Sequence, residues 1–141
     1  MHMIFGTKEN APYTDREGAY VILLREGTVG LIQTPKGYFL PGGGMDAGES
    51  PEACIARECG EEMGYDVEIF ERIGSAESYT THPVIGRFHP IQIYYTGRLT
   101  EPVGAPTEQD HRLVWVPQSD APALMFSEMQ AWAIRLAIEG K

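Results

Sequence analysis

The stretch GYFLPGGGMDAGES, from Gly37 to Ser50, holds five glycines and one proline. Glycine weakens regular helices and strands because its backbone loses more conformational freedom on folding than that of any other residue. Such a concentration is expected either at a plain turn or where something must come very close to the backbone. The residues that follow decide between these two interpretations.

A helix start follows the glycines directly. Ser50, Pro51 and Glu52 provide a serine cap, a proline at the first helical position and an acid in the first turn. The pattern predicts a helix over Pro51–Met63, and Gly64 suits the left-handed residue that ends a helix.

Three glutamates gather on one side of this helix. At about 100° per residue, Glu58, Glu61 and Glu62 share one face. The buried stripe beside that face is predicted to hold Ile55, Ala56, Cys59 and Met63. A solvated charged face is the ordinary explanation, but Glu58 and Glu62 repel each other, and Glu61 and Glu62 oppose the helix dipole. Converging carboxylates suit a hard divalent cation, so the spacing favours a metal site, which the glycine backbone could approach closely.

The chain from Gly43 to Tyr65 also resembles a known motif. It reads Gly43, five residues, Glu49, seven residues, and then RECGEEMGY. This is similar to the Nudix box, G-x5-E-x7-R-E-U-x-E-E-x-G-U, in which U is a bulky apolar residue. All seven fixed identities are present, and the one departure is Cys59, which can still pack as a small hydrophobe.

The resemblance to the Nudix hydrolase family implies a fold and an activity. The fold is α/β, an α/β/α sandwich with a mixed β-sheet between helices, here as a single domain over residues 1–141. The activity is hydrolysis of the pyrophosphate linkage of a nucleoside diphosphate derivative, with Mg²⁺ or Mn²⁺ as cofactor and a (deoxy)nucleoside triphosphate as the leading substrate. An ADP-ribose or dinucleoside polyphosphate pyrophosphatase is the alternative, although Tyr79 and Pro83 do not stand at the offsets associated with those enzymes.

The family's pattern also implies roles for individual residues. The metal ligands implied by position are Glu58, Glu61, Glu62 and the carbonyl oxygen of Gly43. Glu58 is also the predicted general base, and Arg57 and Glu49 are expected to orient the acids through charge-assisted hydrogen bonds.

Further site residues are expected outside the box, because the family can take its base or an extra ligand from there. Glu108 and Asp110, in PTEQDHRLVWVP, are the candidates, and a solvated loop pair is the alternative. Aromatic residues that could stack on a base, but that more often fill core and surface, are Tyr79, Tyr94, Tyr95 and Phe126.

The rest of the chain predicts strands and one more helix. The expected strands are Ala19–Leu24, Leu31–Thr34, Tyr38–Leu40, Asp66–Gly74, His89–Leu99 and His111–Pro117. The helix is expected over Ser127–Gly140, with Met129, Trp132, Ile134 and Leu136 facing mostly inward. Strands before, between and after two helices indicate a mixed sheet with helices on its faces.

Composition narrows the class of partner. Lys and Arg number 11 against 20 Asp and Glu, a formal charge of −9, which repels nucleic-acid backbones and argues against polymer binding. A small nucleotide accompanied by divalent cations remains compatible, as does a homodimer. No apolar run approaches a membrane span and no signal-peptide pattern opens the chain, so a cytoplasmic protein without membrane contact is expected.

The cysteines and histidines predict no site of their own. Cys54 and Cys59 point in different directions from one helix, so free thiols are expected rather than a disulfide. The four histidines show no metal-ligand spacing; they are His2, His82, His89 and His111.

Two other functions compete with the hydrolase. One is a Nudix-fold sensor that binds a nucleotide without cleaving it, and the other is a plain structural domain with an acidic helix. Sensors of this kind usually lose acids of the box, whereas this chain keeps all of them, which favours the enzyme.

Overall fold

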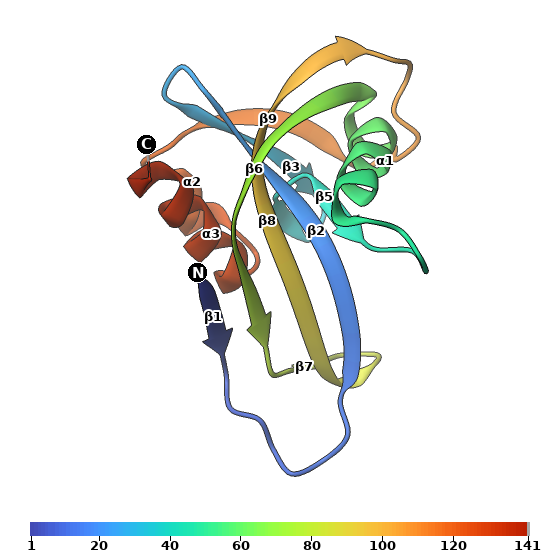
Figure 1. Cartoon of the computed structure of the whole chain (residues 1–141), viewed down its shortest axis with the longest axis vertical. Coiled ribbons are helices and arrows are strands. Elements are labelled where there is room, and N and C mark those ends of the chain that lie inside the picture. Colours follow the sequence, from blue (N-terminus) through green and yellow to red (C-terminus); the bar gives the residue numbers. More distant parts are fainter. Residues whose placement is uncertain (141) are drawn as a thin grey trace.

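The computed structural model describes residues 1–140, and their strands form one mixed sheet (Figure 1). The strands are β1 (His2–Phe5), β2 (Thr14–Arg25), β3 (Thr28–Thr34), β4 (Gly37–Phe39), β5 (Gly42–Gly44), β6 (Tyr65–Ser78), β7 (Thr80–His82), β8 (Gly86–Pro102) and β9 (Arg112–Pro117). Their order is β1-β6-β8-β2-β3-β4, and β5, β7 and β9 pair with β2, β8 and β3 respectively. The β1–β6 and β2–β8 pairs are parallel and the others are antiparallel, which makes the sheet mixed.

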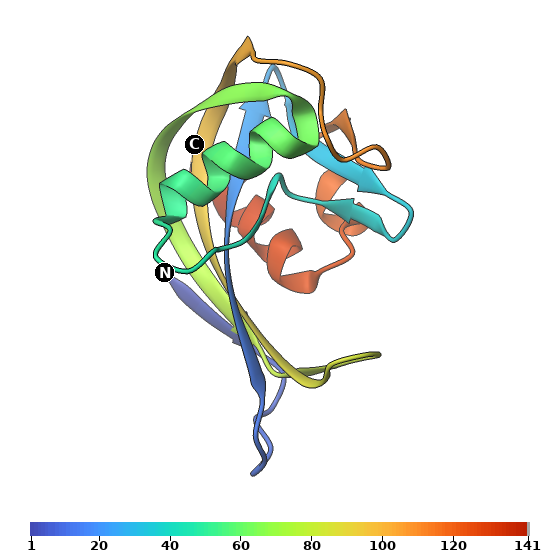
Figure 2. The ribbon, with the colours of Figure 1, turned by 90° about the vertical axis from the view of Figure 1, so that its right-hand side faces the viewer.

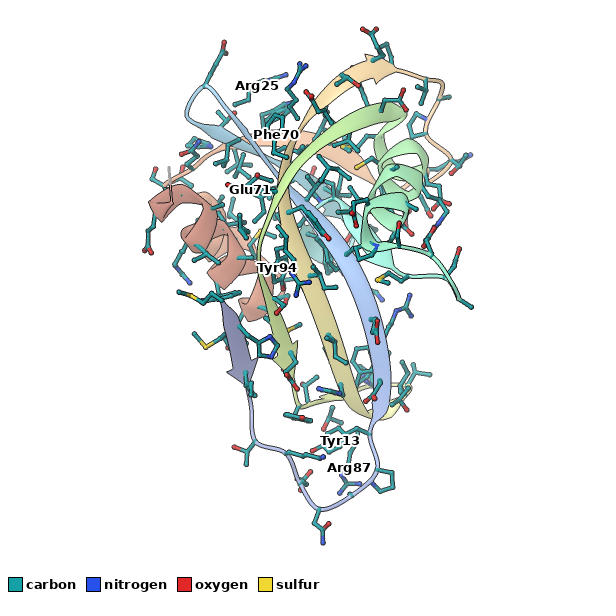
Figure 3. The ribbon with its side chains drawn as sticks, in the orientation of Figure 1. Tyr13, Arg25, Phe70, Glu71, Arg87 and Tyr94 are labelled. Atoms are coloured by element: carbon teal, nitrogen blue, oxygen red, sulfur yellow. The ribbon has the colours of Figure 1, made fainter. Side chains whose placement is uncertain are left out.

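Helices cover both faces of the sheet, with α1 (Pro51–Met63) on one side and α2 (Ala121–Leu124) and α3 (Glu128–Glu139) on the other (Figures 1 and 2). One hydrophobic core lies under α1, built from alternate residues of β2 and β8 such as Val21 and Tyr95. The other lies under α3 and holds Ile22 and Tyr94, the intervening residues of the same strands. Figure 3 shows Tyr94 in the middle of the molecule. The predicted fold class is therefore confirmed.

Helix α1 has the bounds that its end signals predict. The Ser50 hydroxyl accepts a hydrogen bond from the Ala53 amide at 3.1 Å, and Gly64 ends the helix with φ 73°. The predicted buried stripe is wrong at Ala56, which is exposed; Cys54 is buried instead. Glu62 is buried as well, because it reaches inward toward β5 rather than outward to solvent.

Each predicted strand overlaps an observed one, but four short elements were missed: β1, β5, β7 and α2. In α3, Trp132 and Leu136 are only half-buried, and the fully covered face contains alanines and Gln130. Cys54 and Cys59 are buried free thiols, as expected. Within residues 1–140, none of the helices has the length and apolar character needed to cross a membrane.

Candidate active site

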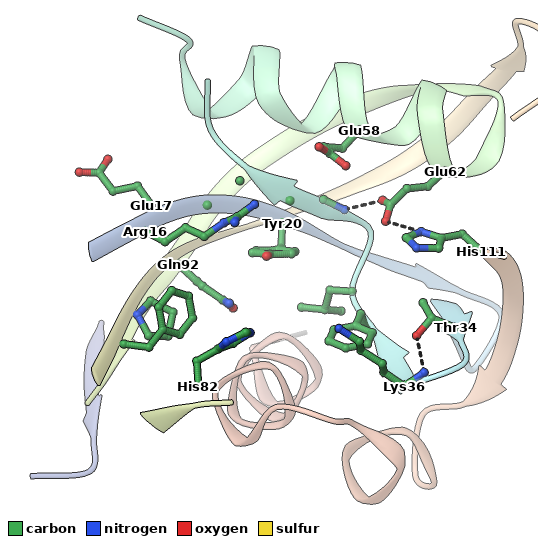
Figure 4. A pocket seen from close by; sticks show the side chains of 18 of the residues that line it. Arg16, Glu17, Tyr20, Thr34, Lys36, Glu58, Glu62, His82, Gln92 and His111 are labelled. Carbon is green, nitrogen blue, oxygen red and sulfur yellow. Dashed lines mark hydrogen bonds and ion pairs between the residues drawn. The ribbon is translucent and has the colours of Figure 1, made fainter. Parts of the chain in front are cut away.

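A cavity of about 610 Å³ opens beside the glycine strand β5 and the C-terminal half of α1 (Figure 4). Its other walls come from β2, from the β3–β4 turn, from the hairpin of β7 and β8, and from the segment before β9. The ionisable and amide side chains in its lining are Arg16, Glu17, Lys36, Glu58, Glu62, His82, Gln92, Asp110 and His111. This volume falls in the range of small-molecule sites.

Strand β5 brings the backbone against the acidic helix. The Gly42 amide donates to Glu62 Oε1 at 2.9 Å, and the Gly44 carbonyl accepts from Arg57 Nη2 at 3.0 Å. A Cβ on Gly43 would lie 2.6 Å from the carboxyl carbon of Glu58, closer than real Cβ atoms approach. Close approach thus requires glycine at position 43, and the group that approaches it is the carboxylate of Glu58.

Arg57 holds the acids in a charged network. It binds Glu49 through two nitrogens, at 2.8 and 2.9 Å, and its Nη1 donates to Glu58 at 2.9 Å and to Glu61 at 3.2 Å. The hydrogen bonds from Arg57 lower the pKa of Glu49 to about 2, and the same pairing raises the pKa of Arg57. The expected orienting contacts of Arg57 and Glu49 are therefore present in the structure.

Glu62 is the most deeply buried acid of the site. Its exposed fraction is 5%, and burial raises its pKa to about 8, helped by the charges of Glu58, Glu108 and Glu61 and opposed by the Gly42 hydrogen bond. Burial also raises the pKa of Glu58, while its hydrogen bond from Arg57 acts in the opposite direction. A buried carboxylate without a full countercharge is costly, and a bound cation would remove that cost.

His111 faces Glu62 from the segment before β9. Its Nδ1 lies 3.3 Å from Glu62 Oε2 and is the one buried side-chain nitrogen or oxygen within residues 1–140 that lacks a well-formed hydrogen bond. His111 could not be selected from the sequence, because the four histidines lack metal-ligand spacing. Its position depends on the fold, because the amides of Thr107 and Glu108 both donate to the Glu61 carbonyl and hold this segment against the end of α1.

The same segment carries the two acids expected outside the box. Ligand atoms of Glu108, Asp110 and His111 all lie within 4.8 Å of one another. Asp110 lines the cavity, although its side chain is 67% exposed. The structure therefore places this acidic segment beside the helix that bears the other carboxylates.

The Gly43 carbonyl and the four aromatic candidates have the following surroundings in the structure. The Gly43 carbonyl, a predicted ligand, accepts a hydrogen bond from the Cys54 thiol at 3.3 Å. Of the aromatic candidates, Tyr94 and Tyr95 are buried in the two cores, Tyr79 stacks on His89, and Phe126 is 63% exposed. The aromatic residues that line the cavity are Tyr20, Phe39 and Phe88.

The residues present fit a hard divalent cation such as Mg²⁺ or Mn²⁺. Such ions prefer oxygen ligands, and the site gathers carboxylates from α1 and from the Glu108–Asp110 segment beside a close backbone strand. The raised pKa of Glu62 has burial as its main cause, and the charges of neighbouring glutamates raise it further. Glu58, Glu61 and Glu62 stay the ligands that the family's pattern implies, whereas the group whose ligand atoms lie within 4.8 Å of one another is Glu108, Asp110 and His111.

Comparison with known proteins gives the same fold and a family. A family model described as NUDIX domain matches residues 11–136. A NUDIX hydrolase from Nitrosomonas europaea superposes with a TM-score of 0.75 at 17% identity, over 91% of each chain.

Two curated relatives match over shorter segments. The NAD-capped RNA hydrolase NudC of Pseudomonas aeruginosa (strain LESB58) is 37% identical over 75 residues, 49% of this chain and 26% of that protein. A putative 8-oxo-dGTP diphosphatase of Bacillus subtilis (strain 168) is 41% identical over 61 residues, 41% of each chain. The chain thus aligns with less than half the length of these relatives.

The burial of Glu62 predicts a folding stability that decreases as the pH rises. Because its pKa rises from 4.5 to about 8 on folding, the folded protein keeps a proton that the unfolded chain releases, and stability falls as pH rises between these values. Glu62→Gln keeps an acceptor for the Gly42 amide without this cost. Since one pKa unit corresponds to about 1.4 kcal/mol, the stability advantage of the variant should grow by about 4 kcal/mol from about pH 5 to about pH 8.5.

The measurement is urea unfolding of both proteins in EDTA at the two pH values. A stability difference that stays constant, or that shrinks toward high pH, would show that Glu62 does not titrate as a buried acid.

Proposed function

The chain belongs to the NUDIX domain family, and on that basis we propose that it hydrolyses the pyrophosphate linkage of a nucleoside diphosphate derivative with Mg²⁺ or Mn²⁺. A (deoxy)nucleoside triphosphate is the proposed substrate. The observation that carries this proposal is the buried carboxylate of Glu62, held by the Gly42 amide at the wall of a nucleotide-sized cavity. A cation that shares the site would offset the cost of ionising that carboxylate at neutral pH.

In this proposal the glutamates of α1 act as metal ligands, and one of them also acts as the general base. Glu58, Glu61 and Glu62 hold the cation, with the Gly43 carbonyl as a further ligand if it gives up its thiol hydrogen bond. Bound cations neutralise the anionic phosphate oxygens and acidify or orient the attacking water. Glu58 accepts the proton of that water, because its raised pKa lies closer to neutral pH than that of an ordinary carboxylate.

Arg57 and Glu49 act as positioning residues. Their two-nitrogen ion pair fixes the guanidinium, which then holds Glu58 and Glu61 from one side. Because both partners keep their charge at neutral pH, the acids should keep their arrangement whether or not the cation is present.

Arg16 of β2 is the proposed phosphate contact in the lining of the cavity. Its guanidinium lies so close to β5 that a Cβ on Gly44 would be 2.8 Å from Nη2. Among the residues that the structure describes, none forms an ion pair with Arg16, so its charge is available to a ligand.

We further propose that the substrate is a small nucleotide rather than a polymer. The net charge of −9 opposes a polynucleotide backbone away from the cation site. The name of the NudC relative includes a capped RNA, so a capped oligonucleotide belongs in any substrate panel. Homodimer formation and a cytoplasmic location stay predictions from sequence.

The test of the proposed function is phosphate or pyrophosphate release from such a panel with Mg²⁺. Glu62→Gln should lower kcat by at least about a hundredfold, because it removes a metal ligand while keeping the hydrogen bond to Gly42. Glu52→Gln is the matched control, since it neutralises an exposed acid in the first turn of the same helix. Equal turnover by Glu62→Gln and the wild type would remove Glu62 from the mechanism.

Glu108→Gln and Asp110→Asn separate the two acids of the segment before β9. If either supplies a ligand or the base, kcat should fall by about tenfold or more while the melting temperature changes little, because exposed acids contribute little to packing. Both properties are measured on the same preparations. Full activity in both variants would leave this segment a solvated loop.

A further inference from the structure

The cavity has a second end, away from the acids, where the hydrogen-bonding direction of two polar side chains is fixed by the fold. Figure 4 shows Gln92 and His82 across Tyr20 from Glu58 and Glu62. Gln92 projects from β8, and His82 is the last residue of β7. Phe88 packs against His82 and also lines the cavity.

A buried relay fixes the amide of Gln92. The backbone amide of Leu40 can only donate, and it donates to Gln130 Oε1 at 2.8 Å. The other end of that side chain is therefore the nitrogen, which donates to Gln92 Oε1 at 3.3 Å. Gln130 is 1% exposed, so it has no water with which to reverse this order.

The hydroxyl of Tyr94 completes the relay by donating to the same Gln92 oxygen at 2.8 Å. The acceptor of Gln92 is thus used inside the protein by two donors. Its nitrogen has no hydrogen-bond partner within residues 1–140, and Gln92 lines the cavity. What Gln92 offers to a ligand is consequently an N–H donor.

His82 also offers an N–H donor to the cavity, but for a different reason. The backbone amides of Val84 and Ile85 both donate to its Nδ1, each at 3.1 Å. A ring nitrogen that accepts hydrogen bonds carries no proton, so the proton of the neutral ring is on Nε2. His82 packs edge-on against Phe88 at 5.5 Å between ring centroids and lines the same end of the cavity.

From these contacts we infer that this end of the cavity selects a ligand edge that carries hydrogen-bond acceptors, in practice a nucleobase with an oxo group such as hypoxanthine, guanine or uracil. An amide recognises adenine by accepting from its amino group while donating to N7. Here that acceptor is occupied by Tyr94 and Gln130, and an amino group would meet donors. This inference rests on the proposed function for the phosphate end of the ligand.

The test uses two matched pairs of nucleotides, ITP with ATP and UTP with CTP, which differ by oxo against amino groups. We expect wild-type kcat/KM to favour the oxo member of each pair by about tenfold or more. Gln92→Glu should remove or reverse this preference at about pH 8, because a carboxylate still accepts from Tyr94 and Gln130 but presents an acceptor to the ligand. Gln33→Glu, which adds the same charge outside the cavity, should keep the wild-type preference.

A second variant covers the case in which Gln92→Glu does not fold. His82→Phe keeps an aromatic ring beside Phe88 but removes the Nε2 donor, and it should reduce the oxo preference severalfold. The oxo preference can also be measured by binding alone, with no hydrolysis step. This measurement is titration calorimetry with IMP, AMP, UMP and CMP.

The outcomes separate this inference from the proposed function. Turnover with equal kcat/KM within both pairs would overturn the inference and leave the hydrolase intact. Absence of turnover, with oxo-selective binding that Gln92→Glu abolishes, would support the inference and overturn the hydrolase. If no nucleotide is cleaved and no monophosphate binds at millimolar concentration, both fail.

Discussion

The hydrogen bond from the Gly42 amide to Glu62 Oε1 joins the glycine strand to the acidic helix, and the site depends on it. The bond forms because α1 lies against β5 with no side chain between them. A Cβ on Gly42 would lie 2.2 Å from the Ala19 carbonyl, so only glycine lets β5 approach β2 this closely. The packing of α1 against β5 buries Glu62, and this burial raises the pKa of its carboxyl group.

The acids of the site differ in pKa because their surroundings differ. Glu49 pairs with Arg57 and keeps its charge easily, whereas Glu62 is buried with one backbone donor and a poorly aligned imidazole. One arginine thus holds the outer acids in place while the innermost acid lacks a countercharge. A site of this kind is costly to fold without a cation and is prepared to bind one.

Local signals in the sequence were sufficient for α1. The serine cap, the proline and the terminal glycine act within one turn, so the predicted bounds Pro51–Met63 agree with the structure. Strand β5 could not be predicted in this way, because three glycines have no strand preference and form a strand only through pairing with β2. The mixed sheet between helices followed from the alternation of elements.

The site residues outside the box are positioned by contacts between segments that are far apart in the sequence. His111 faces Glu62 only because its loop is bonded to the end of α1. Similarly, Gln130 sets the polarity of Gln92 across a sequence separation of 38 residues, and neither residue belongs to a motif. The sequence could not identify the aromatic residues that line the cavity for the same reason, since the sheet decides which face of a strand meets the cavity.

The central claim is that the buried carboxylate of Glu62 binds a cation, and the direct measurement is the change in melting temperature that millimolar Mg²⁺ produces. A cation that binds only the folded state stabilises it by mass action. The wild type should therefore gain several degrees over its value in EDTA, and Glu62→Gln should lose most of that gain. An equal gain in both proteins, or none in the wild type, would contradict the account.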